Sequence, residues 1–291
     1  MPAQRRCSVR DIHRLLFAAV VIGATVLAAA AALAQNCTPQ NTCTDPRGCP
    51  DFRVDPGALL YVLTLGNTAI DKRTYAPTDC SVVEGEVPAG TNDFLLFSTA
   101  ITNFGPGALT LGNPADHPEW FDLVTCHGHP HIKEYADYRL WTADGYNQWI
   151  ALRAANPGAC AQDLLDANPA IAAQMIKGGK RGFCLYDVLA HNDLSTVSRT
   201  CTAPLDPQTY LDCNNSGLSV CWLDIYEPIP GIDGQSLPIT DLPNGNYVLE
   251  NEANARHFFT ETEYINNSAA VSFRLHQGKI AKKPKPAILT P

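Results

Sequence analysis

The sequence predicts a mainly β protein: a single β-sandwich-like domain with long loops and at most one or two short helices. Short segments rich in apolar and aromatic residues alternate with breaks of Gly, Pro, Asn and Asp, a pattern typical of strands joined by turns. The roughly 257 residues after the N-terminal apolar run would fill one large β domain or two small ones. No internal repeat, P-loop or dinucleotide-binding fingerprint is apparent.

The first 34 residues are typical of a secretion signal. Four arginines precede an apolar run from Leu15 to Leu33, and Ala32-Leu33-Ala34 offers a cleavage site. We therefore expect a mature chain that begins at Gln35, is secreted or periplasmic, and has no stable membrane association after cleavage. The alternative is an uncleaved anchor, because the run approaches the ~20 residues that span a bilayer.

Charge and cysteine content narrow the class of protein further. The formal net charge of −8 becomes −11 without the first 34 residues, since four Arg and one Asp are lost with them. An acidic surface argues against a nucleic-acid partner and suits cationic partners. Ten of the eleven cysteines follow the signal, and an even number in an exported chain predicts disulfides without fixing their connectivity.

The mature chain divides into three parts by composition. Residues 35–57 form a Cys-rich arm, 58–278 the main domain, and 279–291 a Lys/Pro-rich tail expected to be solvated. Apolar alternation predicts strands within residues 59–65, 94–102, 135–141, 246–250 and 270–274. One helix is expected over residues 161–177, with Pro169 as a break.

The segment Cys126-His127-Gly128-His129-Pro130-His131 concentrates three of the eight histidines at alternate positions. In an extended strand, alternate side chains share one face, so His127, His129 and His131 would converge on one ion. Three neutral imidazoles suit copper or zinc, and an open coordination position indicates a catalytic site. The alternative is a solvated histidine cluster.

The segments around and after the histidines favour one of these functions, because they resemble segments of a known family. The stretch from Trp120 to Tyr138 is similar to the copper-binding signature of the lysyl oxidase family, and residues 179–187, Gly-Lys-Arg-Gly-Phe-Cys-Leu-Tyr-Asp, resemble a second family segment. Further matches follow in the family's order at residues 224–226, 233–235, 239–241, 243–247 and 263–267. The resemblance covers roughly residues 51–278, so residues 58–278 are expected to form a lysyl oxidase-like copper domain.

The resemblance implies roles for particular residues. His127, His129 and His131 would bind copper, and Lys180 and Tyr226 would be the precursors of lysine tyrosylquinone, a cofactor made from the protein's own side chains. The Lys180 amine must be neutral to attack an oxidised Tyr226 ring, so its pKa, about 10.4 in water, has to be depressed. Asp224 is the candidate catalytic base, because it would share a strand face with Tyr226; Asp187 is the alternative.

The same resemblance implies a disulfide between Cys126 and Cys201. The remaining pairing stays open, with Cys160, Cys213 or Cys221 as possible partners of Cys184. Gly234 stands where animal enzymes of the family carry Cys, and this departure suggests a microbial branch.

Together these features predict an exported copper- and quinone-dependent amine oxidase. Its substrates would be primary amines, including peptidyl lysine, and dioxygen; its products would be an aldehyde, hydrogen peroxide and ammonia. Two rival hypotheses remain: a non-catalytic secreted or periplasmic copper-binding protein on the same fold, and a zinc hydrolase, which would need a general base beside the metal and gain nothing from Tyr226.

Overall fold

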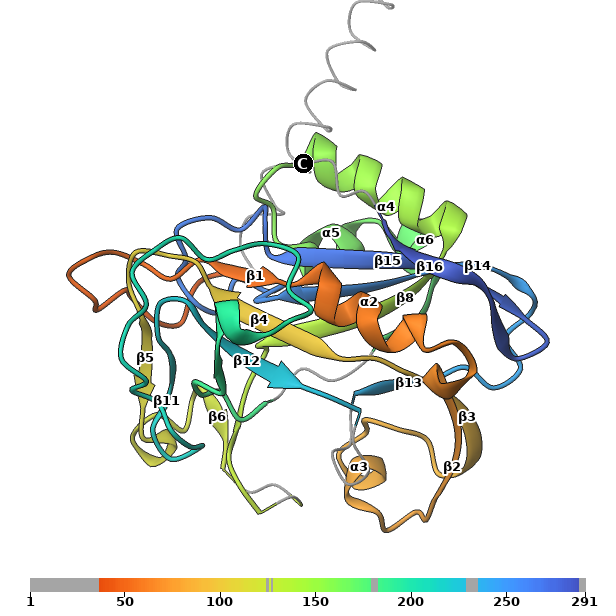
Figure 1. Ribbon diagram of the computed structural model, residues 1–291, viewed down its shortest axis with the longest axis horizontal. Helices are drawn as coiled ribbons and strands as arrows, with labels where there is room; N and C mark the ends of the chain where they lie inside the picture. Colours follow the sequence, from red (N-terminus) through yellow and green to blue (C-terminus); the bar gives the residue numbers. More distant parts are fainter. Residues whose placement is uncertain (1–36, 124–125, 127, 179–182, 229–234, 288–291) are drawn as a thin grey trace, which may run out of the picture.

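Two antiparallel sheets dominate the computed structural model, which describes residues 37–123, 126, 128–178, 183–228 and 235–287 (Figure 1). The larger has the strand order β16 (Lys279–Pro286), β15 (Ser268–His276), β14 (Gly245–Ala253), β8 (Ala136–Thr142), β9 (Met175–Gly178). The second has the order β1 (Phe52–Val54), β4 (Thr99–Asn103), β12 (Trp222–Tyr226), β10 (Leu189–Ala190). One hydrophobic core contains side chains from both sheets, so the mainly β prediction is confirmed.

Three smaller antiparallel sheets extend this framework. The first runs β13 (Ser236–Pro238), β3 (Gly90–Leu96), β2 (Ile70–Tyr75). The second pairs β11 (Ser216–Leu218) with β5 (Leu109–Gly112), and the third pairs β6 (Phe121–Asp122) with β7 (His131–Ile132). The last pair carries the end of the histidine segment.

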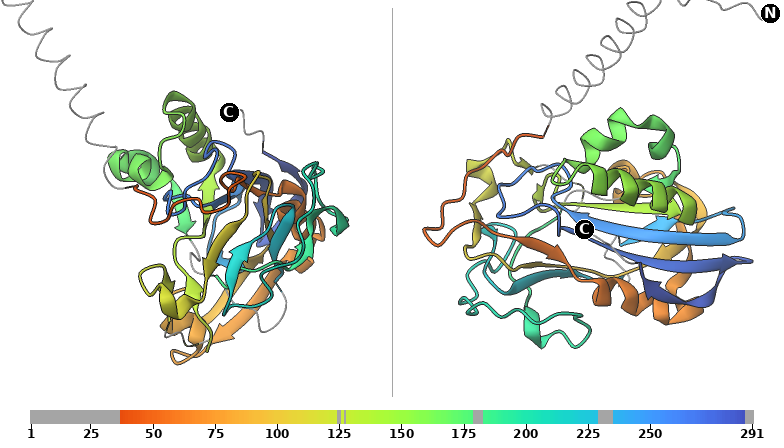
Figure 2. Two further views of the ribbon diagram at one scale, coloured as in Figure 1. Left: turned by 90° about the vertical axis from the view of Figure 1, so that its left-hand side faces the viewer. Right: turned by 90° about the horizontal axis from the view of Figure 1, so that it is seen from above.

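The larger sheet is covered on both faces, and strand β8 shows how. Its side chains alternate: Tyr138 and Leu140 enter the main core, whereas Trp141 joins a second cluster with residues of the helices. Those helices, α4 (Ala143–Ala155), α5 (Ala161–Ala167) and α6 (Pro169–Ala172), lie over the outer face (Figure 2). The protein is therefore a β-sandwich with an additional helical layer.

Residues 59–65, expected to be a strand, instead belong to helix α2 (Pro56–Thr64). Asp55 caps this helix by accepting hydrogen bonds from the Gly57 and Ala58 amides at 2.7 and 3.1 Å, and Pro56 occupies its first turn. Leu59 and Leu63, four residues apart, are both buried on one helix face. The prediction was wrong because the apolar residues fit both periods and the Asp-Pro start signal decided between them.

The other helices also exceed the one or two expected. The described residues contain α2 to α6, including α3 (Cys80–Val83), and the 3-10 helices η1 (Gly66–Ala69), η2 (Pro114–Asp116) and η3 (His191–Asp193). The helix expected over residues 161–177 is divided into α5 and α6 at Pro169, as expected, but Met175–Gly178 pairs with β8 as a strand. Residues 94–102, expected to be one strand, contain the end of β3 and most of β4.

The C-terminal segment is an edge strand rather than a solvated tail. Residues 279–286 form β16, which pairs with β15 through register shifts near Arg274. An edge position tolerates the prolines and lysines of this segment, because one side of the strand needs no hydrogen-bond partners from the sheet. Within the part of the chain described, no helix is long and apolar enough to cross a membrane.

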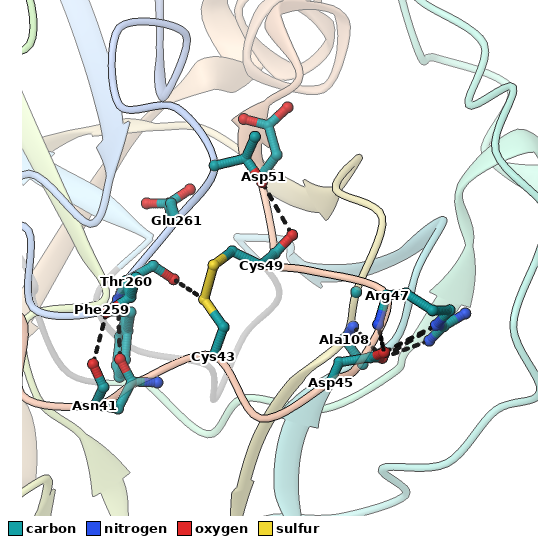
Figure 3. Close-up of a disulfide and its surroundings, with 12 residues drawn as sticks. Asn41, Cys43, Asp45, Arg47, Cys49, Asp51, Ala108, Phe259, Thr260 and Glu261 are labelled. Carbon is teal, nitrogen blue, oxygen red and sulfur yellow. Dashed lines mark hydrogen bonds and ion pairs between the residues drawn. A yellow bond between two sulfur atoms is a disulfide. The ribbon is translucent and has the colours of Figure 1, made fainter.

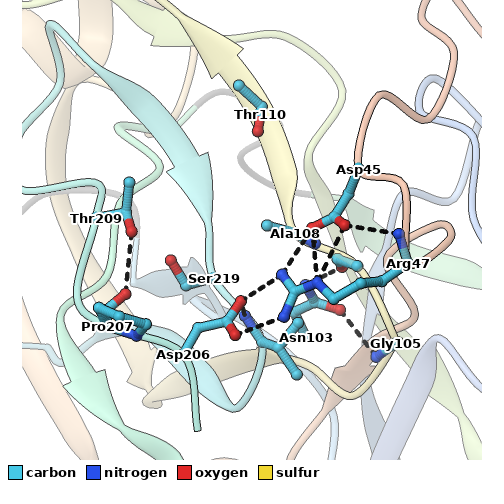
Figure 4. A network of polar contacts seen from close by, with 12 residues as sticks. Asp45, Arg47, Asn103, Gly105, Ala108, Thr110, Asp206, Pro207, Thr209 and Ser219 are labelled. Carbon is cyan, nitrogen blue, oxygen red and sulfur yellow. Dashed lines mark hydrogen bonds and ion pairs between the residues drawn. The ribbon is translucent and has the colours of Figure 1, made fainter. Parts of the chain in front are cut away.

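The Cys-rich arm is shorter than expected, because the chain enters the core at Phe52 in β1. Before that, a disulfide joins Cys43 to Cys49, and the backbone and side chain of Asn41 bind Thr260 on the far C-terminal side of the sequence (Figure 3). Further along, the guanidinium of Arg47 pairs with Asp45 and with Asp206 at 2.6 Å each (Figure 4). These contacts attach the arm to the domain without regular secondary structure.

Candidate metal and cofactor site

The histidine segment is mostly a turn. Only His131 and Ile132 form β7, and Gly128 adopts a φ of +77°, which other residues rarely take. The expected continuous strand was therefore wrong for Gly128, His129 and Pro130. His127 lies outside the described residues.

The two described histidines nevertheless meet. The Nε2 atoms of His129 and His131 lie 3.2 Å apart, and their ring centroids 4.9 Å apart. His131 is buried and His129 is exposed. The turn thus brings the rings together at the protein surface, where an ion can reach them.

This geometry fits a bound copper ion. Metal–imidazole bonds of roughly 2.0–2.1 Å place two adjacent ligand nitrogens roughly 2.9–3.4 Å apart, depending on the angle at the metal. The 3.2 Å separation of the two Nε2 atoms falls in this range. Neutral imidazole nitrogen is a ligand that copper and zinc both accept, so the pair fits either metal.

Strand β7 connects the histidines to the segment that contains Lys180. Ile132 and Phe183 form an isolated antiparallel bridge, with N–O distances of 2.7 and 3.2 Å. Phe183 follows Lys180 by three residues in the sequence. Lys180 itself lies outside the described residues, which include nothing between Gly178 and Phe183.

The same segment contacts Tyr226. The ring centroids of Phe183 and Tyr226 are 5.1 Å apart in an edge-to-face arrangement, and the Tyr226 hydroxyl donates to the carbonyl oxygen of Cys184. Phe183 and Cys184 therefore connect strand β7, which carries His131, to Tyr226.

Asp224 and Tyr226 both lie in β12, so the condition for a shared strand face is met. Asp224 is 1% exposed, in the same strand that packs against β4. Burial raises the pKa of Tyr226 well above its ordinary value, and the charge of Asp224 raises it further. Asp224 also raises the pKa of Tyr135, Tyr138 and Tyr186, although burial is the larger cause for each. A carboxylate therefore sits among phenols that stay protonated at neutral pH.

The carboxylate of Asp187, the alternative base, already accepts several hydrogen bonds within the protein. Its fully buried carboxylate accepts hydrogen bonds from the amides of Thr209, Tyr210 and Ser219 and from the Ser219 hydroxyl, at 2.7 to 3.1 Å. A carboxylate bound by four donors anchors the loops that supply them, which is a structural role.

All ten cysteines from Cys37 onward form disulfides, but the expected Cys126–Cys201 bond is wrong. The bonds are Cys37–Cys160, Cys43–Cys49, Cys80–Cys126, Cys184–Cys213 and Cys201–Cys221. The Cα atoms of Cys80 and Cys126 lie 5.3 Å apart, within the range that a disulfide can bridge. The turn that carries His129 and His131, the candidate metal turn, is therefore attached to α3, not to the loop between η3 and β11 that contains Cys201. The open partner of Cys184 is Cys213.

Glu84 is a site residue that the sequence did not reveal. It ends α3, and its Oε1 accepts a 2.6 Å hydrogen bond from the Cys126 amide, while Oε2 lies 4.0 Å from His131 Nδ1. Cys80, four residues earlier, was the only available signal, because its bond to Cys126 brings this helix to the histidines.

Comparison with known proteins supports the resemblance. Residues 159–283 match the lysyl oxidase family model; the matched span includes Lys180, Asp224 and Tyr226 and begins after the histidine segment. The chain is 28% identical over 191 residues to lysyl oxidase homolog 2 of Gallus gallus, covering 64% of this chain and 19% of that protein. It is also 28% identical over 182 residues to protein-lysine 6-oxidase of Homo sapiens, covering 62% and 33%. The chain thus spans about a fifth to a third of the length of these curated relatives.

Proposed function

We propose that this chain, which carries a lysyl oxidase domain, is an exported copper-dependent amine oxidase that makes lysine tyrosylquinone from Lys180 and Tyr226. One observation supports this proposal above the others. Phe183, three residues after Lys180, pairs with the histidine strand at Ile132 and packs against the Tyr226 ring. Three residues span at most about 11 Å, so the chain itself limits how far Lys180 can be from both partners.

Each residue has a distinct role in this proposal. His129 and His131, with His127, would hold the copper ion through imidazole nitrogens. Bound copper and the quinone would supply the redox chemistry with dioxygen that side chains alone lack. The chain's own residues would position the Tyr226 ring, held by Phe183 and the Cys184 carbonyl, and deliver the Lys180 amine in its neutral form.

Asp224 is the proposed base. It would remove the proton from the carbon that bears the substrate nitrogen, which requires a carboxylate within hydrogen-bond reach of that proton. Its side chain is buried among tyrosines, which keeps bulk water away from the carboxylate. The overall reaction consumes the amine, dioxygen and water and releases aldehyde, ammonia and hydrogen peroxide.

Primary amines with positive charge are the proposed substrates, and peptidyl lysine is one of them. The net charge of −8, or −11 after signal cleavage, attracts cations over several ångströms, and added salt weakens this attraction. One relative is named a protein-lysine 6-oxidase, which motivates peptidyl lysine as the first substrate to test.

The main rival is a copper-binding protein that never forms a quinone. Such a protein needs the histidines but has no use for the contact between Phe183 and Tyr226. A zinc hydrolase has no use for it either. The amine oxidase is therefore the function that uses the largest part of this site.

The decisive experiment is peptide mass spectrometry of copper-loaded, aerated protein. We expect a cross-link between the peptides that contain Lys180 and Tyr226, quinone absorption, and peroxide release on addition of a primary amine. Lys180→Ala and Tyr226→Phe should abolish all three, whereas the controls Lys283→Ala and Tyr61→Phe, at exposed positions, should retain them. Copper-loaded wild-type protein with both side chains unmodified would refute the proposal.

A further inference from the structure

Helix α3 and the residue after it contact the metal turn at two points. Cys80 at its start is disulfide-bonded to Cys126, and Glu84 at its end binds the Cys126 amide. The backbone amide of Glu84 donates to the carbonyl oxygen of Cys80, so both contacts come from one short, internally bonded unit. The position of Glu84 relative to the turn is therefore fixed by a covalent bond and by hydrogen bonds.

The two oxygens of Glu84 have different partners. Oε1 accepts from the Cys126 amide at 2.6 Å, and Oε2 faces Nδ1 of His131 at 4.0 Å. The other ring nitrogen of His131, Nε2, faces Nε2 of His129 at 3.2 Å. The separation from Oε2 is longer than a direct hydrogen bond, so the interaction is electrostatic in this conformation.

A carboxylate beside Nδ1 favours the tautomer that carries hydrogen there. That tautomer leaves the Nε2 lone pair available to a metal ion. Metal-binding histidines commonly face a carboxylate in this way, and loss of the carboxylate lowers metal affinity by about 10- to 100-fold.

We propose that Glu84 is a positioning residue for the copper site: it sets the tautomer and orientation of His131 so that Nε2 meets the ion held with His129. This inference rests on the proposed copper site. It assigns the β2–β3 connection, which was not part of the site predicted from the sequence, to the residues that prepare the site for metal.

Burial makes the electrostatic interaction between Glu84 and His131 stronger than that of an exposed pair at the same distance. The side chains of His131 and Glu84 are 9% and 19% exposed. A second contact of the same kind, between His117 Nδ1 and Glu119 at 3.2 Å, involves side chains 37% and 56% exposed. Solvent screens the second pair more strongly, although its atoms are closer. This exposed pair is a matched control.

The test is Glu84→Gln, which preserves the shape of the side chain. Its single carbonyl oxygen can still accept from the Cys126 amide, and its NH2 group then faces His131 Nδ1 as a donor. This exchange favours hydrogen on Nε2, the wrong tautomer for binding. We expect Cu(II) affinity, measured by competition with a chelator, to fall by about 10- to 100-fold, with altered hyperfine splitting in the electron paramagnetic resonance spectrum.

Two controls separate this role from scaffolding. Glu119→Gln should leave both the affinity and the spectrum unchanged. Metal-free Glu84→Gln should unfold at the same temperature as the wild type, because the glutamine keeps the hydrogen bond from the Cys126 amide. If Glu84→Gln binds copper with wild-type affinity and spectrum, Glu84 does not set the His131 tautomer. If the wild type itself binds no copper, the proposed function fails first, and the two failures are distinguishable.

Discussion

Two regions of the molecule bury charge in opposite ways. Under helices α4 to α6, Arg139 is surrounded by acids: its guanidinium contacts Asp137, Glu250 and Glu252 at 2.6 to 3.2 Å. On the metal side, the buried carboxylate of Asp224 lies among tyrosines whose pKa values burial and its own charge raise. The first arrangement neutralises charge, and the second places it beside groups proposed to react.

The network under the helices is densely bonded. Glu250 also accepts from the indole N–H groups of Trp141 and Trp149 at 2.9 and 3.0 Å, and Glu252 pairs with Arg153 at 2.6 Å. Burial opposes the charge on Glu252, but Arg153 and Arg139 hold its pKa below the ordinary value. Buried ions are tolerated when every member has partners, so this region locks the helical layer onto the sheet.

The metal side relies instead on short elements and disulfides. Strand β7 has two residues, and the turn before it is held by Cys80–Cys126 and Glu84. The difference suggests that one region mainly stabilises the fold and the other contains the candidate site. Mutations in the first should lower stability without changing copper binding.

The largest expected effect is on turnover. Asp224→Asn removes the proposed base and should lower kcat for a primary amine by about 10²- to 10⁴-fold. The pKa of Tyr226 should fall, because a negative charge that raises it is lost. Copper content should not change, which separates a catalytic defect from a binding defect. Near-normal turnover would remove Asp224 from the mechanism.

Arg139→Ala should have the largest effect on stability. It leaves Glu250 and Glu252 buried without their shared cation, at a cost of about 3–5 kcal/mol in the free energy of unfolding. Arg274→Ala, at an exposed position of β15, is the control and should cost under about 0.5 kcal/mol. Denaturant titration measures both. Equal losses would mean that the buried network does not stabilise the helical layer.

Removing one disulfide at a time compares the regions directly. Replacing Cys80 and Cys126 by Ala should cost about 2–5 kcal/mol and also weaken copper binding, because the turn loses its attachment to α3. Replacing Cys201 and Cys221 should cost stability in the same range and leave copper affinity unchanged. Copper binding that responds equally to both would contradict the separation of regions.

The smallest expected effect is a local loss of structure at low pH where the N-terminal arm contacts the domain. Hydrogen bonds from Arg47 lower the pKa of Asp45 and of Asp206 below their ordinary value of 3.8. A lowered pKa stabilises the folded state above that value, and the contribution is lost as the pH falls below it. The Ala108 amide, which donates to Asp45 at 2.9 Å, should therefore lose hydrogen-exchange protection between about pH 4 and pH 2. Amides within β14 should keep theirs; equal losses would indicate general acid unfolding.

Local patterns predicted part of this molecule well. Strand β8 alternates apolar and polar residues, and β14 and β15 include the strands expected at residues 246–250 and 270–274. The break at Pro169 separates α5 from α6 where expected. Helix α2 was mistaken for a strand, because its leucine and tyrosine positions fit either period and the Asp55-Pro56 start signal was not used. The edge strand β16 was not predicted, because its lysines and prolines are typical of a solvated tail. Pairing with β15 makes it a strand despite this composition.

The sequence by itself determined the class of fold, the even number of cysteines after residue 34 and the residue types of the candidate site, because periodicity, composition and motif order are local properties of the chain. Only the tertiary structure decided which cysteine holds the metal turn, that Glu84 faces His131, and that Phe183 links Ile132 to Tyr226. Those contacts join residues tens of positions apart. Their choice depends on how the sheets pack in three dimensions, which no short segment encodes.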